Sequence, residues 1–262
     1  MNTYDFRLKY RPKRFNEVIG NKLTIRVLKN IVITGRIPSA ALFHGPPGTG
    51  KSTLSYVFPK ALSCLNFEDD VCDECENCLA MDKYFPKGAW WLVDIHDCTR
   101  INVTHLDDLI RRHFNVFPQT RIGKNIHVFD EFQRAQPQFQ EKFLTELETN
   151  PDLLLIFSLI DISRVEEAFQ QRVTALKTTR PELDELVSWL HDICSLENIS
   201  VTDTEALRHL AITANLLPRE CLRLLQTISY MSNSLTLSLV QEVFQDDPST
   251  FDELPETVVL DE

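Results

Sequence analysis

The chain has 262 residues, 43% of them hydrophobic, which is enough to bury a sizeable core and to form two domains. No stretch approaches the ~20 consecutive apolar residues of a membrane span, and the opening MNTYDFRLKYRPKRF lacks the apolar segment of a signal peptide. These features argue against a membrane protein or a membrane partner and predict a cytoplasmic location. Thiols stay reduced in that compartment, so the seven cysteines favour metal ligation over disulfides.

The net charge of −11 is concentrated near the C-terminal end. Residues 242–262 contain eight acidic residues and no Lys or Arg, which leaves −3 for the rest of the chain. Residues 7–14 form a small basic arm. Overall acidity argues against tight general DNA binding, so any contact with nucleic acid is expected to be local.

Hydrophobic runs predict five strands that alternate with helices. The strands are expected in AALFH, WWLVDIH, NIHVFDE, LLLIFSLI and VTALKTT, at residues 40–44, 90–96, 125–131, 153–160 and 173–179. Helices are expected in STLSYVFPKAL, VTHLDDLIRRHF and QPQFQEKFLTELE. This alternation predicts an α/β domain whose mostly parallel sheet is covered on both faces.

Strand signals stop after TTRPELDEL, near Arg180. We therefore expect an α/β domain over residues 1–180 and a domain of helices only over 181–245. One of its helices opens with a capping-box pattern from Thr202 to Glu205. The acidic tail, 246–262, is expected to be disordered.

The segment GPPGTGKS matches a phosphate-binding loop between a strand and a helix. Glycines let backbone N–H groups turn toward phosphate oxygens, and the following helix N-terminus adds positive potential. Lys51 supplies a point charge, and the hydroxyl of Ser52 can ligate Mg²⁺. The pattern predicts binding of ATP with Mg²⁺.

In NIHVFDE, a hydrophobic strand ends in two carboxylates, Asp130 and Glu131. Nucleotide-hydrolysing sheets hold the Mg²⁺ ligand and the group that orients the attacking water at such a strand end. We expect Asp130 to hold the metal and Glu131 to polarise water.

Four cysteines, Cys64, Cys72, Cys75 and Cys78, lie within 15 residues. Four thiolates at this spacing suit tetrahedral zinc with no position left for water, which predicts a structural zinc insert over about residues 62–82. The alternative, a set of small hydrophobic residues on a helix, fits the charged flanks NFEDD and DECEN poorly. The other three cysteines lie in apolar contexts and are expected in the core.

Together these residues resemble the gamma/tau subunit of the bacterial DNA polymerase III clamp loader, an AAA+ ATPase with a helical lid domain. The resemblance rests on LKYRPKRFNEVIGN, FHGPPGTGKST, the four-cysteine insert, VDIHDCTR, VFDEFQRA and LPRECLRLL, and it spans roughly residues 5–230. It assigns YRPKRFNEVIG to the adenine pocket. The residues that the loop and the resemblance assign to the nucleotide are Arg11, Pro12, Val18, Ile19, Gly45, Gly48, Thr49, Gly50, Lys51, Ser52, Thr53 and Arg219.

The resemblance also assigns three arginines. Arg219 matches a lid arginine that senses the γ-phosphate. Arg172 falls where the family has an arginine that enters the ATP site of the neighbouring subunit, in trans. Arg100 matches a position that faces DNA phosphates in the central channel.

The chain departs from the family in three ways. The serine-arginine-cysteine motif has become Gln171, Arg172 and Val173. At the end of the fourth strand, where the family has a polar threonine, stand Leu159 and Ile160, with Ser158 the nearest hydroxyl. No collar domain follows the helical segment, although in the family the collar holds the ring together.

Three functions stay open at this point. The first is a clamp-loader-type ATPase that assembles with other AAA+ subunits in a ring or spiral and acts on a sliding clamp and primer-template DNA. The second is a nucleotide switch or scaffold in another DNA transaction, such as a mobile element or phage defence. The third is a nearly inactive structural subunit, against which the intact Lys51, Asp130 and Glu131 argue.

Overall fold

The computed structural model describes residues 4–114 and 120–245. The chain divides into two compact units: an α/β unit, residues 12–179, and a helical unit that combines the described residues up to Arg11 with those from Arg180 onward. The predicted acidic tail, 246–262, lies outside the described residues. None of the helices within the described ranges has the length and apolar content needed to cross a bilayer.

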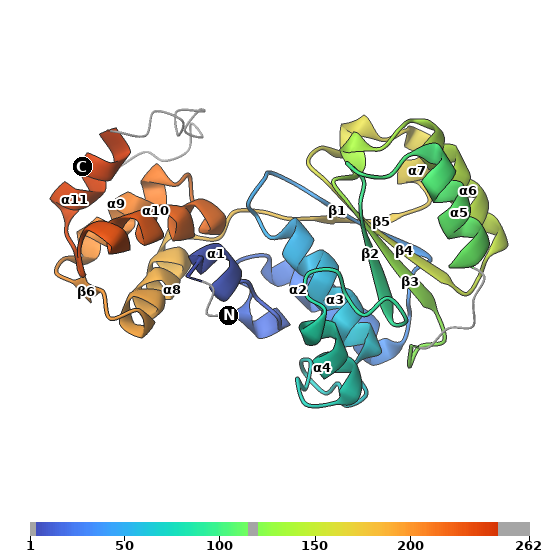
Figure 1. The fold of residues 1–262 in the computed structure, drawn as a ribbon, viewed down its shortest axis with the longest axis horizontal. Coiled ribbons are helices and arrows are strands. Elements are labelled where there is room, and N and C mark those ends of the chain that lie inside the picture. Colours follow the sequence, from blue (N-terminus) through green and yellow to red (C-terminus); the bar gives the residue numbers. More distant parts are fainter. Residues whose placement is uncertain (1–3, 115–119, 246–262) are drawn as a thin grey trace. The chain divides into compact units, whose positions relative to one another are not determined.

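Five parallel strands form the sheet of the α/β unit, in the order β2-β3-β4-β1-β5 (Figure 1). The predicted α/β class and mostly parallel sheet are confirmed. The strands begin and end close to the expected runs, but β2 starts three residues late because a turn precedes it, in which the N–H groups of Leu92 and Val93 donate to the Ala89 carbonyl at 2.7 and 2.8 Å. Their bounds are β1 Ala40–His44, β2 Val93–Asp97, β3 Asn125–Asp130, β4 Leu153–Leu159 and β5 Thr174–Lys177.

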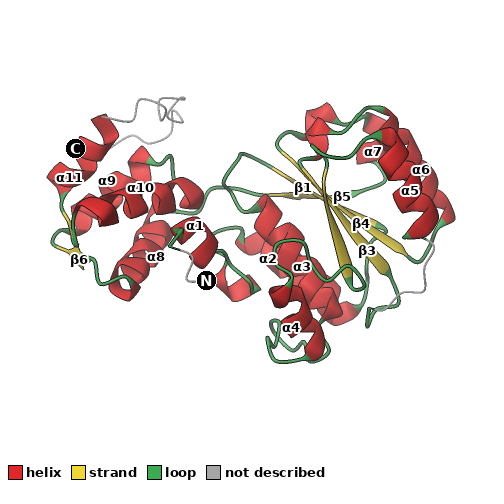
Figure 2. Ribbon diagram, in the orientation of Figure 1, coloured by secondary structure: helices red, strands yellow, loops and turns green. Residues whose placement is uncertain are grey.

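Helices cover both faces of this sheet, α2 and α3 on one side and α5 and α6 on the other (Figures 1 and 2). Because side chains alternate along a strand, β1, β3 and β4 contribute hydrophobic side chains to two cores, one on each face of the sheet. Val128 and Ile156 belong to the first core, and Phe129 and Phe157 belong to the second. The helices are α2 Lys22–Thr34, α3 Lys51–Ser63, α4 Glu76–Lys83, α5 Val103–Arg112, α6 Gln138–Thr149 and α7 Glu167–Gln170, with 3₁₀ turns η1 Phe15–Glu17, η2 Phe132–Arg134 and η3 Ile162–Arg164.

The helical unit also contains a short parallel pair of strands, which the expectation of helices only missed. Each strand has two residues, too few for a period-2 hydrophobic pattern to appear in the sequence. The elements are α1 Phe6–Lys9, α8 Leu183–Leu196, β6 Ser200–Val201, α9 Thr204–Thr213, α10 Pro218–Met231, β7 Ser234–Leu235 and α11 Leu237–Gln245.

Helix α1 groups with this helical unit, whereas the sequence predicted a single α/β domain over residues 1–180. The main-chain N–H of Phe6 donates to Gln226 Oε1 at 3.1 Å, and Lys9 Nζ lies 2.6 Å from Glu197 Oε1. These partners lie about 190 to 220 positions away in the chain, so local pattern could not reveal them.

The expected capping box at Thr202 is wrong by one residue. Asp203 caps α9, and its Oδ1 accepts from the main-chain N–H of Glu205 at 2.9 Å. The Thr202 hydroxyl instead donates to the Leu235 carbonyl at 2.9 Å, because the neighbouring strand pair offers it that partner.

Candidate nucleotide-binding site and cysteine cluster

The loop Gly45–Gly50 links β1 to α3, as the sequence predicts. Gly45 has a φ of 146°, and a Cβ on it would lie 2.3 Å from the carbonyl oxygen of Thr178. Gly48 and Gly50 also have positive φ, at 77° and 98°. Glycine is therefore required at position 45 for this loop to pass against the end of β5.

Two polar residues that were not predicted from the sequence, Asn21 and Thr178, hold the loop in place. Asn21 Nδ2 donates to the Thr49 carbonyl at 2.9 Å, and its Oδ1 accepts from the N–H of Thr179 at 2.9 Å. The hydroxyls of Thr49 and Thr178 lie 2.8 Å apart. Asn21 is one amide among many in the sequence, so its role becomes visible only once the end of β5 is adjacent.

Lys51 folds back over the loop that precedes it. Its Nζ donates to the carbonyls of Gly45 and Pro46 at 2.8 and 2.7 Å. Burial lowers the pKa of Lys51, although Glu131 and Asp130 act against that shift. The ammonium is thus held at the phosphate-binding loop by two main-chain carbonyl oxygens.

Asp130, at the end of β3, meets two hydroxyls from other elements. Ser52 Oγ donates to Asp130 Oδ1 at 3.1 Å, and Ser158 Oγ contacts the same oxygen. The register pairs Phe129 with Phe157, so Ser158 is the next residue along β4 and stands directly beside Asp130. A hydroxyl and a carboxylate in this arrangement are the ligands that P-loop proteins offer to Mg²⁺.

Glu131 takes a left-handed backbone conformation, with φ 56° and ψ 41°. A non-glycine residue held there is uncommon and occurs most often at functional sites. Its main-chain N–H donates to Ser158 Oγ at 3.3 Å. Gln133 restrains the side chain: its Nε2 donates to Glu131 Oε2, and its Oε1 accepts from the N–H of Ile160 at 3.3 Å.

Strand β4 ends at Leu159, and Ile160 follows it. Leu159 is fully buried in the core under α5 and α6, whereas Ile160 is 37% exposed. The Ile160 carbonyl accepts from the N–H of Gly45 at 3.1 Å. Among the described residues, Ser52 and Ser158 contact the Asp130 carboxylate, and Gln133 contacts that of Glu131.

The other predicted nucleotide contacts stay predictions. Pro12, Val18 and Ile19 lie half-buried in the α/β unit, where Val18 packs against the core. Arg11 and Arg219 belong to the helical unit, and Arg219 is exposed in the first turn of α10.

Two predicted arginines lie on the surface of the α/β unit. Arg172 is half-exposed and forms an ion pair with Glu148 of α6. Arg100 follows β2, is 85% exposed, and has its Nε 3.2 Å from Asp97 Oδ2. Both guanidinium groups are accessible to a partner, and their predicted roles remain predictions.

The four cysteines at positions 64–78 come together at the end of α3. All four are free thiols whose Sγ atoms lie within 4.8 Å of one another, and Cys64 Sγ is 3.6 Å from Cys72 Sγ. Zn–S bonds of about 2.3 Å put neighbouring sulfurs of a tetrahedral site about 3.8 Å apart, so the cluster fits zinc. The N–H of Cys75 points at Cys72 Sγ at 3.3 Å, as is typical around a thiolate.

The thiols differ in acidity. Burial raises the pKa of Cys64 and Cys78. At Cys75 burial also raises the pKa, but hydrogen bonds from the main chain of Cys78 and Leu65 outweigh it and lower the pKa to about 7. Cys75 therefore loses its proton more easily than Cys64 or Cys78, and the thiolate is the form that binds metal.

A buried lysine ties the insert to α3. Lys60 is fully buried, and its Nζ lies 2.7 Å from Asp73 Oδ1 and 2.9 Å from Asp82 Oδ1. Tyr56 also donates to Asp82 at 2.9 Å. The insert thus joins the helix that follows the phosphate-binding loop.

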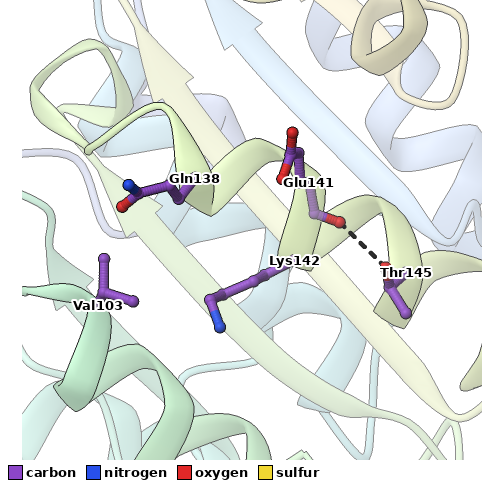
Figure 3. Close-up of a pocket in the computed structure, with 5 residues that line it drawn as sticks. All are labelled: Val103, Gln138, Glu141, Lys142 and Thr145. Carbon is purple, nitrogen blue, oxygen red and sulfur yellow. Dashed lines mark hydrogen bonds between the residues drawn. The ribbon is translucent and has the colours of Figure 1, made fainter.

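A surface pocket lies away from this site, on α5 and α6 (Figure 3). Along α6 the Thr145 hydroxyl donates to the main-chain carbonyl of Glu141 at 3.1 Å. Glu141 itself is exposed. Nothing in the lining of the pocket resembles a phosphate site. The residues are Val103, Gln138, Glu141, Lys142 and Thr145.

The model of the DNA polymerase III delta subunit family matches residues 20–174, more than half of the chain. The chain belongs to this clamp-loader family. Among its relatives is the DNA polymerase III subunit gamma/tau of Mycoplasma pneumoniae, 30% identical over 232 residues, which cover 88% of this chain and 33% of that protein. Protein STICHEL of Arabidopsis thaliana is 28% identical over 241 residues, 91% of this chain and 19% of that protein.

This clamp-loader family member spans about a third or less of the length of those two relatives. Its fold is similar to that of RuvB, the Holliday junction branch migration motor of Thermotoga maritima, with a TM-score of 0.65 and 16% identity. The match covers 93% of this chain and 76% of that one. At this identity the likeness establishes a shared fold and nothing about activity.

Proposed function

We propose that the chain binds ATP with Mg²⁺ and hydrolyses it as one subunit of a clamp-loader-type DNA replication complex. The observation that carries the proposal is the corner where Ser52 Oγ lies 3.1 Å from Asp130 Oδ1, with Lys51 on the adjoining loop. Ser52 and Asp130 bind Mg²⁺, Lys51 binds the β- and γ-phosphates, and Glu131 orients water. Family membership supports the replication context.

A nucleotide-binding experiment on the full chain tests this proposal. Lys51→Ala should weaken the binding of a fluorescent ATP analogue in Mg²⁺ by more than about tenfold, because it removes the charge that faces the phosphates. Glu131→Gln should retain binding and lower turnover about 100-fold or more. Glu141→Gln, an exposed carboxylate on α6, is the matched control. Unchanged affinity in Lys51→Ala would contradict the proposal.

The same proposal includes a shared site between subunits. Arg172 completes the ATP site of a neighbour, which requires a head-to-tail contact and generates rings or spirals. In one chain by itself Arg172 pairs with Glu148, so assembly has to exchange that carboxylate for phosphate. We therefore expect slow hydrolysis by the isolated chain, and assembly promoted by a non-hydrolysable ATP analogue.

Light scattering with and without that analogue tests the shared site. Arg172→Ala should lower turnover in the assembly, whereas Arg164→Ala, an exposed arginine of η3, should not. Nucleotide binding with no turnover in any assembly would favour the alternative, a nucleotide switch or scaffold in another DNA transaction.

DNA contact through Arg100 is part of the proposal as well. Each subunit offers few cationic contacts, so binding to primer-template DNA should depend on assembly and fall steeply with salt. Arg100→Ala should weaken it, and Arg111→Ala on α5 serves as the control.

The insert is proposed to hold one structural zinc through Cys64, Cys72, Cys75 and Cys78. The convergence of their sulfur atoms supports it. Elemental analysis of the purified protein tests it: the wild type should carry one more zinc per chain than a Cys78→Ser variant.

A further inference from the structure

A second group of metal-type donors lies inside the sheet, apart from both the phosphate-binding loop and the cysteines. Asp94 and His96 point to one face of β2, and His127 points to the same face of β3, because the register pairs Asp94 with His127. The face is the one that α5 and α6 cover, where Phe114 and Phe129 flank the two imidazole rings. We refer to Asp94, His96 and His127 as the strand cluster.

The donor atoms of the strand cluster converge. His96 Nε2 lies 3.2 Å from His127 Nδ1 and 3.5 Å from Asp94 Oδ2, and all three ligand atoms lie within 4.8 Å of one another. A tetrahedral ion with bonds of about 2.0–2.1 Å separates its ligand atoms by about 3.3 Å. Two of the three separations are close to that value without any movement.

Hydrogen bonding alone leaves this arrangement incomplete. His96 Nε2 faces two acceptors, a carboxylate and an imidazole nitrogen, and it carries at most one proton to share between them. The His127 ring also donates a hydrogen bond to the main chain of His113, which acts to raise the pKa of His127. The one proton of the neutral ring is therefore used in that bond. Among the described residues, Asp94 has only long ionic contacts, to His96 at 3.5 Å and to His113 at 3.9 Å. The three side chains of the strand cluster therefore have more lone pairs than protons in a largely buried space. A bound cation would accept those lone pairs.

We propose that Asp94, His96 and His127 bind a divalent first-row transition metal ion, with zinc the best match. Two imidazoles and one carboxylate are a common zinc donor set, and borderline metals prefer such nitrogen ligands over Mg²⁺ or Ca²⁺, which take oxygen. The Asp94 side chain is 20% exposed, and His113 Nδ1, just after α5, lies 3.9 Å from Asp94 Oδ2.

The protonation states favour this use. Burial lowers the pKa of His96 to about 3 and lowers that of His127 well below its usual value, so both rings are neutral near pH 7. Neutral imidazole is the form that ligates metals. A bound ion would link β2 to β3, the strands that lead to Arg100 and Asp130.

Metal stoichiometry of the full chain tests the proposal. After dialysis against zinc, elemental analysis should find one more ion per chain in the wild type than in a His96→Gln, His127→Gln double variant. This difference does not depend on how full the cysteine cluster is. The matched control is His191→Gln, which removes an exposed histidine from α8 and should change nothing.

Thermal unfolding in added Zn²⁺ gives a second readout. A ligand that binds only the folded chain raises its melting temperature, so zinc should raise it more in the wild type than in the double variant. If circular dichroism shows that the double variant does not fold, Asp94→Asn should still weaken the additional zinc at least about tenfold by removing the anionic ligand. Equal zinc content in the wild type and the folded double variant, or unchanged affinity in Asp94→Asn, would overturn the proposal.

Discussion

The cysteine cluster and the strand cluster bring their donor atoms together in different ways. Cys64, Cys72, Cys75 and Cys78 lie in one segment of 15 residues. His96 and His127 are 31 residues apart and meet only because β2 pairs with β3 in one register. A site made from one segment can be predicted from spacing, whereas a site made across strands requires the sheet.

The largest expected effect is loss of the cysteine site. Cys78→Ser should remove zinc and lower the free energy of unfolding of the α/β unit by at least about 4 kcal/mol, because structural zinc binding couples directly to folding. The cysteines also belong to the core shared with Leu54 and Val57 of α3, so the damage should reach that helix.

Urea unfolding, followed together with zinc content, measures this loss. The control is Cys194→Ser, another buried cysteine, which lies in α8 of the helical unit. If Cys78→Ser is no less stable than that control, the cysteines are ordinary core residues.

The next prediction distinguishes the stability due to zinc from the stability due to the ion pairs that anchor the insert. Lys60→Met should cost about 3 kcal/mol, because it leaves Asp73 and Asp82 without their buried cation. Lys29→Met is the matched control, since Lys29 contacts the same insert through the exposed Asp69, and it should cost less than about 1 kcal/mol. Equal costs, measured by urea unfolding with zinc bound, would show that the anchor lies elsewhere.

A smaller effect concerns the corner that three elements build around Asp130. Ser158→Ala should lower the ATP turnover of the assembled protein about tenfold, equivalent to about 1.4 kcal/mol in the barrier, because Asp130 and the Glu131 main chain lose a common partner. Nucleotide affinity should change little. Ser158→Thr, which keeps the hydroxyl, should retain most turnover, and a Thr variant as slow as Ala would refute a role for the hydroxyl.

The smallest effect is a pH dependence that arises in the strand cluster. The pKa of His96 is about 3 in the folded chain and about 6.5 when unfolded, so the unfolded state binds more protons between these values. Without added metal, lowering the pH from 7 to 6 should therefore reduce the free energy of unfolding by under about 1 kcal/mol for this residue. The fall should be shallower in His96→Gln. An equally steep fall in that variant would mean that other groups govern acid sensitivity.

The sequence alone determined the features that depend on neighbouring residues. Hydrophobic runs gave the five strands of the α/β unit because a strand buried on both faces needs a continuous apolar stretch. The phosphate-binding loop was predictable because Gly45 and Gly50 need backbone freedom beside Lys51. The convergence of the four cysteines was predictable because all four lie in one segment of 15 residues.

The tertiary structure decided the features that depend on partners distant in the chain. Ser158, Gln133 and Asn21 are ordinary polar residues in the sequence, and they matter because β4, η2 and the end of β5 bring them to the loop and to Asp130. Helix α1 groups with the helical unit through contacts to α10, for example from Phe6 to Gln226, which is 220 positions later in the chain. Such contacts are set by strand register and by the packing of whole helices, which no single segment encodes.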